Sequence, residues 1–267
     1  MTTQPLTTEP VPPTARAFTD RLRRREAAVG YWVVLDAPVA TERIARLGYD
    51  YVCVDGQHGL VEYSGILRAL TAVDAGGRSV GLVRVGANDP FLIGQALDAG
   101  AAGVIVPLVN SAEDAARAVS SATYPPQGTR SYGPMRSGLR VGPVPAEANA
   151  AIACLAMIET PEGLEAVEEI CAVPGLTGVY VGPSDLCLAV GGAFPGDPAV
   201  ADVFEAALER IRTAAAAAGV AAGIHTPAGA DAAKRLAEGF TFATVSSDLV
   251  HLERAAADHL SAARGDR

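Results

Sequence analysis

Residues 152–188, IACLAMIETPEGLEAVEEICAVPGLTGVYVGPSDLCL, decide the fold of this chain. An apolar run, a helical segment and a second apolar run follow one another, which is the pattern of two parallel strands joined by a helix. The first run ends at Glu159, and the second ends at Gly182-Pro183-Ser184-Asp185. Parallel α/β folds place their chemistry at the carboxyl ends of the strands. The stretch therefore predicts two carboxylates, Glu159 and Asp185, at equivalent places on the functional edge of a sheet.

The same alternation of strand and helix patterns runs through the whole chain, with Gly or Pro at the joints. Eight units of about 33 residues without a break in composition predict an α/β fold, a single (β/α)8 TIM barrel. A doubly wound sheet is the alternative, but no GxGxxG follows an early strand. The expected strands are residues 30–35, 51–54, 80–85, 103–107, 152–158, 178–181, 221–225 and 242–245.

Composition restricts the classes of partner that the protein is expected to bind. Its 267 residues carry a net charge of -9, which argues against nucleic acid or an anionic membrane as partner. No apolar run reaches the length of a membrane span. We expect residues 1–15 to be a disordered N-terminal arm without features of a secretory signal, and residues 16–267 to be the catalytic barrel. The four cysteines form no CxxC pair, so we expect a cytoplasmic protein without a zinc or disulfide framework.

Lysine is almost absent, which restricts the possible mechanisms. Lys234 is the only lysine, and the other 20 basic residues are arginines. A Schiff-base mechanism would have to use Lys234. Because this residue lies in a helical segment, ADAAKRLAEGF, we expect it on a solvated helix face.

Glu159 and Asp185 are the first candidates for chemistry. They end neighbouring strands, which lie ~4.8 Å apart in a sheet, so their carboxylates can converge. Two carboxylates without His or Cys suit Mg²⁺ or Mn²⁺. The alternative is that both are helix N-caps. Thr160, however, can cap the helix that begins at Pro161, which leaves Glu159 without a structural role and favours the metal interpretation.

Three further polar residues follow strands 2 and 3. His58 and Asp55, in VDGQHG, could be a general base and the residue that orients it, or simply hydrogen-bonded loop residues. Arg84 at the end of strand 3 could stabilise an enolate or a carboxylate, or could pair with Glu159 or Asp185 inside the barrel. The run Gly182-Pro183-Ser184 offers backbone N–H groups that could hold a substrate carboxylate.

The remaining histidines, the single tryptophan and one long loop point less specifically to a function. His225 ends strand 7 and could line the mouth, although a packed histidine is the plainer interpretation. Trp32 is expected in the core, and His251 and His259 at a surface or subunit contact. Residues 124–145 form a long loop, and long loops in barrels are usually functional.

Five stretches together resemble the HpcH/HpaI aldolase family of class II pyruvate aldolases, which have a (β/α)8 barrel. They are YDYVCVDGQHG, VRVGANDPFLIGQALDAGAAGVIVPLV, YPPQGTRSYG, MIETPEGLEAVEEI and GVYVGPSDL, in family order. The resemblance covers roughly residues 30–260. It implies a metal-dependent, 4-hydroxy-2-oxoheptanedioate aldolase-like enzyme that reversibly cleaves a 4-hydroxy-2-oxo acid to pyruvate, or a close 2-oxo acid, and an aldehyde.

The resemblance also implies roles for individual residues. Glu159 and Asp185 would hold Mg²⁺, Mn²⁺ or Co²⁺, and Arg84 would bind the 2-oxo oxygen and the enolate. His58 would act as base on the C4 hydroxyl through a water, oriented by Asp55. The amides of Ser184 and Asp185, after Gly182 and Pro183, would hold the pyruvate carboxylate. Asp98, in LDAGA, matches a carboxylate that reaches the site of a neighbouring subunit.

The chain departs from the family pattern at three places. Met157 stands where some members have Gln, Gln57 stands where others carry Glu, and the 124–145 loop, which is expected to shape aldehyde specificity, differs in SYGPMRSG.

Family members are usually hexamers built from trimers, with the last barrel helix exchanged between subunits, so the resemblance implies a homo-oligomer, a trimer or hexamer. Alternatives are an oxaloacetate decarboxylase, a malyl- or citryl-CoA lyase, or a non-catalytic barrel. No clear basic cluster is available to bind CoA, and a non-catalytic barrel would be expected to lack Glu159, Asp185 or Arg84.

Overall fold

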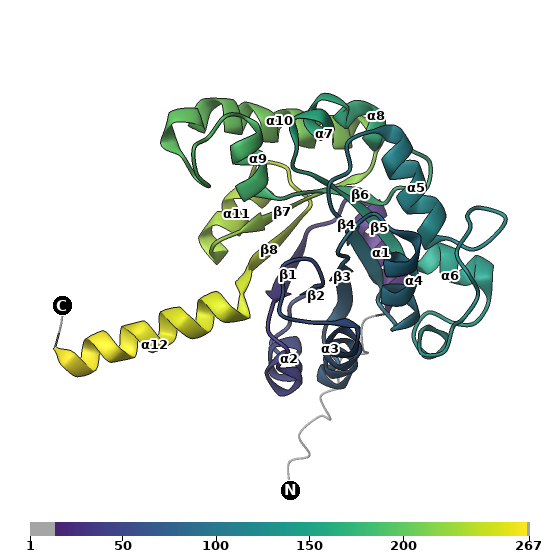
Figure 1. Ribbon diagram of the computed structural model, residues 1–267, viewed down its shortest axis with the longest axis horizontal. Coiled ribbons are helices and arrows are strands. Elements are labelled where there is room, and N and C mark those ends of the chain that lie inside the picture. The colour runs from purple at the N-terminus through teal and green to yellow at the C-terminus, as the bar shows by residue number, and fades with distance from the viewer. Residues whose placement is uncertain (1–13, 266–267) are drawn as a thin grey trace, which may run out of the picture.

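The computed structural model describes residues 14–265, which fold into a closed barrel of eight parallel strands in sequential order (Figure 1). The predicted (β/α)8 barrel is therefore confirmed. The strands are β1 (Ala28–Val33), β2 (Tyr51–Asp55), β3 (Val80–Arg84), β4 (Gly103–Val106), β5 (Ala153–Ile158), β6 (Gly178–Val181), β7 (Ala221–Thr226) and β8 (Phe242–Ser247).

Twelve α-helices lie within the described residues, and most of them follow a strand. They are α1 (Ala15–Arg23), α2 (Pro38–Ala45), α3 (Tyr63–Gly76), α4 (Pro90–Asp98), α5 (Ala112–Ala122), α6 (Pro145–Ala151), α7 (Pro161–Glu165), α8 (Val167–Cys171), α9 (Pro183–Ala189), α10 (Ala201–Ala218), α11 (Gly229–Ala237) and α12 (Asp248–Arg264). Short 3₁₀ turns, Ser137–Leu139 and Pro198–Val200, lie in loops. The sequence predicted one helix where α7 and α8 are divided at Ala166.

Large side chains fill the interior of the barrel. The rings of Tyr51 and Tyr180 point inward, and both hydroxyls bond the Thr244 hydroxyl at 2.6 Å. Tyr51 fits because its neighbour is Gly30, where an added Cβ would lie 2.1 Å from the ring. The interior is thus a packed core rather than a channel, as barrels of this size require.

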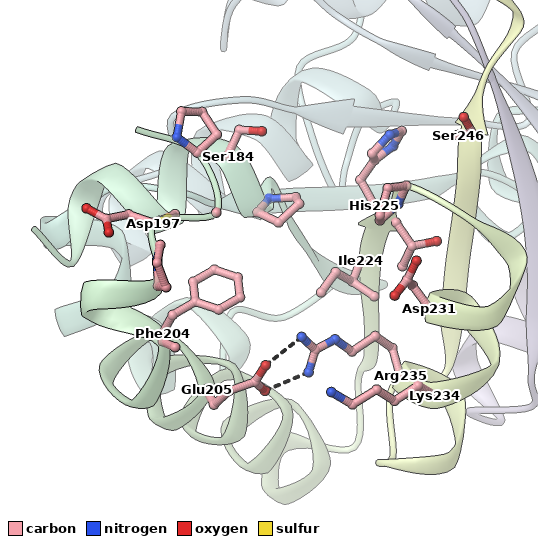
Figure 2. A pocket seen from close by; sticks show the side chains of 18 of the residues that line it. Ser184, Asp197, Phe204, Glu205, Ile224, His225, Asp231, Lys234, Arg235 and Ser246 are labelled. Carbon is pink, nitrogen blue, oxygen red and sulfur yellow. Dashed lines mark hydrogen bonds and ion pairs between the residues drawn. The ribbon is translucent and has the colours of Figure 1, made fainter. Parts of the chain in front are cut away.

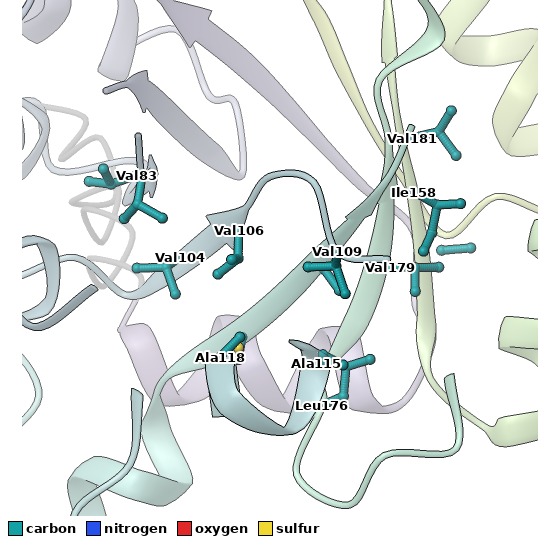
Figure 3. Packing of buried hydrophobic residues seen from close by; sticks show 14 of the residues in the cluster. Val83, Val104, Val106, Val109, Ala115, Ala118, Ile158, Leu176, Val179 and Val181 are labelled. Carbon is teal, nitrogen blue, oxygen red and sulfur yellow. The ribbon is translucent and has the colours of Figure 1, made fainter. Parts of the chain in front are cut away.

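The outer faces of the strands pack against the helices. Figure 3 shows valines of β3, β4 and β6 together with Ile158 of β5 and with Ala115 and Ala118 of α5. Because each strand is buried on both faces, its sequence reads as a continuous apolar run, which explains why alternation of apolar and polar residues was absent.

Helix α1 closes the amino-terminal end of the barrel. Its buried Phe18 and Leu22 pack with the interior cluster, and the Phe18 and Tyr51 rings are 5.6 Å apart. Thr14 caps the helix by accepting a hydrogen bond from the Ala17 N–H at 3.1 Å. This helix was not predicted from the sequence. The expected disordered arm, residues 1–15, lies outside the described residues except for Thr14 and Ala15.

Helix α12 extends away from the barrel, as the yellow helix in Figure 1 shows, and none of its 17 residues is buried. Its start is fixed, because the Asp248 carboxylate accepts hydrogen bonds from the Val34 N–H at 2.9 Å and the Leu35 N–H at 3.2 Å. Between residues 14 and 265, no helix is both long and apolar enough to cross a membrane.

Candidate active site

A cavity of about 290 Å³ lies at the carboxyl ends of the strands. Most of the polar residues singled out in the sequence meet there. It is lined by Trp32, Val34, His58, Arg84, Met157, Tyr180, Gly182, Pro183, Ser184, Asp185, His225 and Ser247. Glu159 borders it, since an added Cβ on Gly182 would lie 2.7 Å from the Glu159 Oε2.

Asp55 and Arg84 form a buried ion pair at the base of this cavity. They are register partners at the ends of β2 and β3, which places their side chains beside each other. The Arg84 Nε donates to the Asp55 Oδ1 at 2.8 Å, and a second guanidinium nitrogen donates to Oδ2. Such a bidentate pair fixes the guanidinium plane. The predicted alternative, a pair between Arg84 and Glu159 or Asp185, is wrong because Asp55 takes this role.

The pair keeps both groups charged despite burial. Burial by itself would raise the pKa of Asp55, but hydrogen bonds from Arg84 and from the Gln57 and His58 amides outweigh it and hold the pKa below its usual value. Burial would likewise lower the pKa of Arg84, yet Asp55 raises it. Arg84 therefore offers a permanent positive charge to the cavity.

Trp32 has a larger role than the core packing expected of it. Its indole N–H donates to the Asp55 Oδ2 at 3.2 Å, and its ring lies 5.1 Å from the Arg84 guanidinium carbon. The ring also stacks on Tyr180, with centroids 5.9 Å apart. These contacts could not be predicted from the sequence, because they depend on β1 lying next to β2 in the closed barrel.

Glu159 is a buried carboxylate, only 4% exposed, and no cation pairs with it within the described part of the chain. Its Oε1 accepts one hydrogen bond, from the Leu108 N–H at 2.8 Å. Burial raises the pKa of Glu159, and the nearby Asp185 charge raises it further. An isolated buried carboxylate is costly. The site therefore suits a cation beside Glu159.

Asp185 lies on α9, a helix that the sequence analysis did not predict. Gly182 is the N-cap residue of this helix, and Asp185 is exposed in its first turn. Thr160 caps α7 as predicted, because its Oγ1 accepts a hydrogen bond from the Gly163 N–H at 3.0 Å. The N-cap alternative for both carboxylates is therefore wrong, and both remain available as ligands.

The two carboxylates fit a hard divalent cation rather than zinc. Among residues 14–265, no three His, Cys, Asp or Glu side chains are grouped to hold a metal. The absence of a Cβ on Gly182 leaves the Glu159 Oε2 accessible. Two carboxylate ligands with open positions are the donor set that Mg²⁺ and related ions accept.

His58, after β2, and His225, on β7, both line the cavity. His58 is exposed on the β2 loop, where its backbone N–H donates to the Asp55 Oδ1 at 3.2 Å. The Asp55 carboxylate thus bonds the backbone N–H of His58. The side chains that it contacts are those of Arg84 and Trp32. His225 packs edge-on against Trp32, and burial, together with the Arg84 charge, lowers its pKa to about 4. His225 is therefore neutral at physiological pH.

Asp98 and the 124–145 loop lie at the other end of the barrel. Asp98 ends α4 and accepts from Arg130 at 2.6 Å, while Arg140 pairs with Asp74 near the end of α3 at 2.7 Å. Helices of a parallel barrel run opposite to the strands, so their carboxyl ends lie away from the strand carboxyl ends. Neither the loop nor Asp98 lines the cavity of its own barrel, and their role in a neighbouring subunit stays a prediction.

Lys234 lies on α11 with a 60% exposed side chain, 3.8 Å from Glu238. The expected solvated helix face is confirmed. Because Lys234 does not line the cavity that holds Arg84 and Asp185, the imine route has no lysine there.

Comparison with known proteins gives consistent matches. A family model described as HpcH/HpaI aldolase/citrate lyase matches residues 28–255. A hydroxypyruvate/pyruvate aldolase of Rhizorhabdus wittichii is 40% identical over 238 residues, which are 89% of this chain and 94% of the relative. A 5-keto-4-deoxy-D-glucarate aldolase of Klebsiella pneumoniae is 37% identical over 235 residues, 87% and 90% of the two chains.

A solved structure has the same architecture. The HpcH/HpaI aldolase/citrate lyase family protein of Burkholderia cenocepacia superposes with a TM-score of 0.83 at 32% identity, covering 93% of this chain and 99% of the other.

Proposed function

This chain belongs to the HpcH/HpaI aldolase/citrate lyase family, and we propose that it is a divalent-metal-dependent aldolase, a carbon–carbon lyase. Its reaction is the reversible cleavage of a 4-hydroxy-2-oxo acid to pyruvate, or a close 2-oxo acid, and an aldehyde. The supporting observation is the meeting of Glu159, Asp185, Arg84 and His58 at one barrel mouth. Oxaloacetate decarboxylation would use the same half of the site, and no contact favours it.

Glu159 and Asp185 would hold the cation, which is Mg²⁺, Mn²⁺ or Co²⁺ in this proposal. When bound, such an ion acts as a Lewis acid that polarises a 2-oxo group and stabilises negative charge on its oxygen. Leu108 positions the first ligand, because its N–H donates to the Glu159 Oε1. The left-handed backbone of Leu108, with φ at 53°, turns this N–H toward the carboxylate.

Arg84 would bind the 2-oxo oxygen and hold the negative charge that develops there during cleavage. Its plane is set in advance by Asp55, and its charge persists at all working pH values. Preorganised charges of this kind typically contribute a factor of about 10²–10³ to the rate. Trp32 excludes water from one face of the guanidinium.

His58 would accept the C4 hydroxyl proton as the C3–C4 bond breaks, and return it in the addition direction. Its exposed position on the β2 loop leaves room for the water through which the family resemblance implies it acts. Asp55 would support this step by fixing the loop backbone. The amides of Ser184 and Asp185, at the start of α9, would hold the substrate carboxylate.

A metal-dependent activity assay tests the function directly. Pyruvate release from a panel of 4-hydroxy-2-oxo acids and from oxaloacetate is expected to vanish after EDTA treatment. Added Mg²⁺, Mn²⁺ or Co²⁺ is expected to restore it, because Glu159 and Asp185 cannot polarise a carbonyl without a cation. Pyruvate release is followed with a coupled dehydrogenase. Full activity in EDTA, or no pyruvate from any compound with any of the three metals, would contradict the proposal.

We further propose that the protein is a homo-oligomer, a trimer or hexamer, in the cytoplasm. Four buried free thiols, Cys53, Cys154, Cys171 and Cys187, fit a reducing compartment. The projecting helix α12 exposes Val250, Leu252 and Leu260, and exposed apolar residues on an unpacked helix fit exchange of that helix between subunits.

Charges on α12 are expected to break the assembly. In the double variant Leu252→Glu/Leu260→Glu, burial of two carboxylates in a subunit contact would be unfavourable. The molar mass from light scattering should fall to that of a smaller species. The matched control on the same helix is Glu253→Gln, which should keep the parent mass. An unchanged mass in the double variant would contradict the exchanged helix.

A further inference from the structure

Glu159 is held by the loop of a neighbouring strand. β4 and β5 are paired in the barrel, and each is followed by a short loop at its carboxyl end. The β4 loop, residues 107–111, directs the Leu108 N–H to the Glu159 Oε1 at 2.8 Å. The other oxygen, Oε2, faces Gly182, where an added Cβ would lie 2.7 Å away. One carboxylate oxygen is therefore fixed by the β4 loop, while the other stays accessible beside Gly182.

The contacts of Glu159 differ from those of Glu205. Glu205 lines another cavity, of about 570 Å³, between α9, α10, α11 and the ends of β7 and β8 (Figure 2). Both of its carboxylate oxygens accept from the Arg235 guanidinium, at 2.6 and 2.7 Å, as the dashed lines show. Such a pair neutralises the carboxylate. A backbone N–H orients Glu159 without neutralising it, so the negative charge of Glu159 remains available to a cation.

The direction of the Leu108 N–H depends on the conformation of the whole β4 loop. Leu108 has a left-handed backbone, with φ at 53°, which is unfavourable for a residue with a side chain. Its side chain is exposed, whereas the next residue, Val109, is buried in the apolar cluster that Figure 3 shows. An unfavourable backbone conformation persists only where the surrounding contacts hold it. Val109 is one of these contacts, and it anchors the loop in the core.

Asn110 supplies the polar contact that holds the same loop. Its Oδ1 accepts a hydrogen bond from the Thr160 hydroxyl at 2.5 Å, although the two residues are 50 positions apart. Thr160 directly follows Glu159, so this bond joins the β4 loop to the segment that carries the carboxylate. The Asn110 backbone N–H donates to the Asp114 Oδ2 on α5 at 3.0 Å. Asn110 is thus bonded both to α5 and to the segment after β5.

The first turn of α7 packs closely against the β4 loop. An added Cβ on Gly163 would lie 2.6 Å from the Val109 carbonyl oxygen and 3.0 Å from the Thr160 Oγ1. The Thr160 hydroxyl accepts from the Gly163 N–H at 3.0 Å and donates to Asn110. A hydroxyl that both donates and accepts has a fixed orientation. The residue after Glu159 is therefore held from two sides.

We propose that Asn110 is a positioning residue of the metal site. Through Thr160 it holds the β4 loop in place, so that the Leu108 N–H fixes the Glu159 Oε1 and leaves the Oε2 for the cation. The inference rests on the proposed function, in which Glu159 is a ligand. Loss of a group that orients a metal ligand typically weakens metal binding by about 10- to 100-fold. Asn110 itself does not line the cavity of about 290 Å³, so its effect passes through Thr160 and Leu108.

Binding of Mn²⁺ to the metal-free protein, measured from the EPR signal of free Mn²⁺, tests this role. Asn110→Ala is expected to raise the Kd for Mn²⁺ by about tenfold or more. Thr160→Ser keeps the hydroxyl and should bind Mn²⁺ as the parent does. A purely structural contribution of Asn110 would lower the Tm in EDTA but would leave the Kd unchanged.

Asn149→Ala is the matched control. The Asn149 side chain bonds the backbone N–H and carbonyl of Tyr124, at 2.7 and 3.0 Å. It lies on α6, directly before β5, and therefore at the other end of the barrel from Glu159. This variant should lower the Tm and keep the parent Kd for Mn²⁺, because it removes equivalent hydrogen bonds without a link to the metal site.

A double-mutant cycle assigns the effect to the bond between the two side chains. Thr160→Val removes the hydroxyl and should also raise the Kd for Mn²⁺. Because both changes break one hydrogen bond, Asn110→Ala should change the Kd by less than about twofold in the Thr160→Val background. Circular dichroism checks that each variant is folded, and Thr160→Val serves alone where Asn110→Ala does not fold. A parent-like Kd in the folded variants, or fully additive effects, would overturn the role of Asn110.

The same titration separates this inference from the function on which it rests. A parent protein that binds no Mn²⁺, or a Glu159→Gln variant that binds it as tightly as the parent, would reject the metal site itself. Binding of Mn²⁺ that requires Glu159 but is indifferent to Asn110 and Thr160 would reject only the positioning role.

Discussion

In the Glu159→Gln variant, metal-dependent cleavage is expected to fall by about 10³-fold or more, because one of the two proposed metal ligands loses its charge. The fold should persist, since Gln has nearly the same shape and can still accept from the Leu108 N–H. Removing a buried charge whose pKa burial has raised should leave the metal-free protein at least as stable as the parent.

Two measurements distinguish this from a general defect. In EDTA, the parent and the variant should melt at similar temperatures, or the variant higher. Added Mn²⁺ should raise the Tm of the parent only, because a ligand stabilises the folded state in proportion to its binding. Glu162→Gln, three residues further along and exposed, is the control that should keep both activity and the Mn²⁺ shift. If Glu159→Gln kept the activity of the metal-loaded parent in the presence of Mn²⁺, the assignment of Glu159 as a ligand would be refuted.

The Asp55→Asn variant is expected to lose about 3–5 kcal/mol of unfolding free energy, because it leaves the buried Arg84 charge unpaired. It should also lose about 10²-fold or more in kcat/KM, since the guanidinium plane is no longer fixed. Urea unfolding and initial rates measure the two effects. The exposed pair of Glu168 and Arg210 is the control, and Glu168→Gln should cost less than about 1 kcal/mol.

A second variant separates stability from function. In Asp55→Asn/Arg84→Met, no unpaired buried charge remains, so much of the stability should return. Activity should not return, because the variant lacks the guanidinium that is proposed to bind the 2-oxo oxygen. Recovery of activity in the double variant, or a single variant as stable as the parent, would contradict the role given to the pair.

The pH dependence of stability gives an independent check on the same pair. The pKa of Asp55 is lower in the folded protein than in the unfolded chain. Its contribution is therefore fully present above the unfolded value of ~3.9 and is lost as the pH falls through the lower, folded value. The difference between parent and Asp55→Asn in unfolding free energy should accordingly be constant from pH 5 to 7 and should shrink below pH 4.

Sequence alone predicted the fold because its signals are local. The apolar runs, the Gly and Pro at their ends and the helical segments between them are readable without tertiary contacts, and the right-handed parallel connection leaves few topologies. The same reasoning located Glu159 and Asp185, since polar residues directly after a strand lie at one edge. It missed α1 and α9, because one covers the barrel end and the other is a short helix that begins at Pro183.

The contacts within the site were decided only by the closed barrel. Arg84 pairs with Asp55 because the register of β2 and β3 puts them side by side, and Trp32 joins them because β1 closes against β2. The cavity between α9, α10 and α11 likewise depends on how these helices pack beside the end of β8. Residue types and their spacing thus determined the barrel and the carboxylates that follow its strands. The strand register, the closure of the barrel and the packing of the helices decided which charged side chains pair, because these features bring together residues that are distant in the chain.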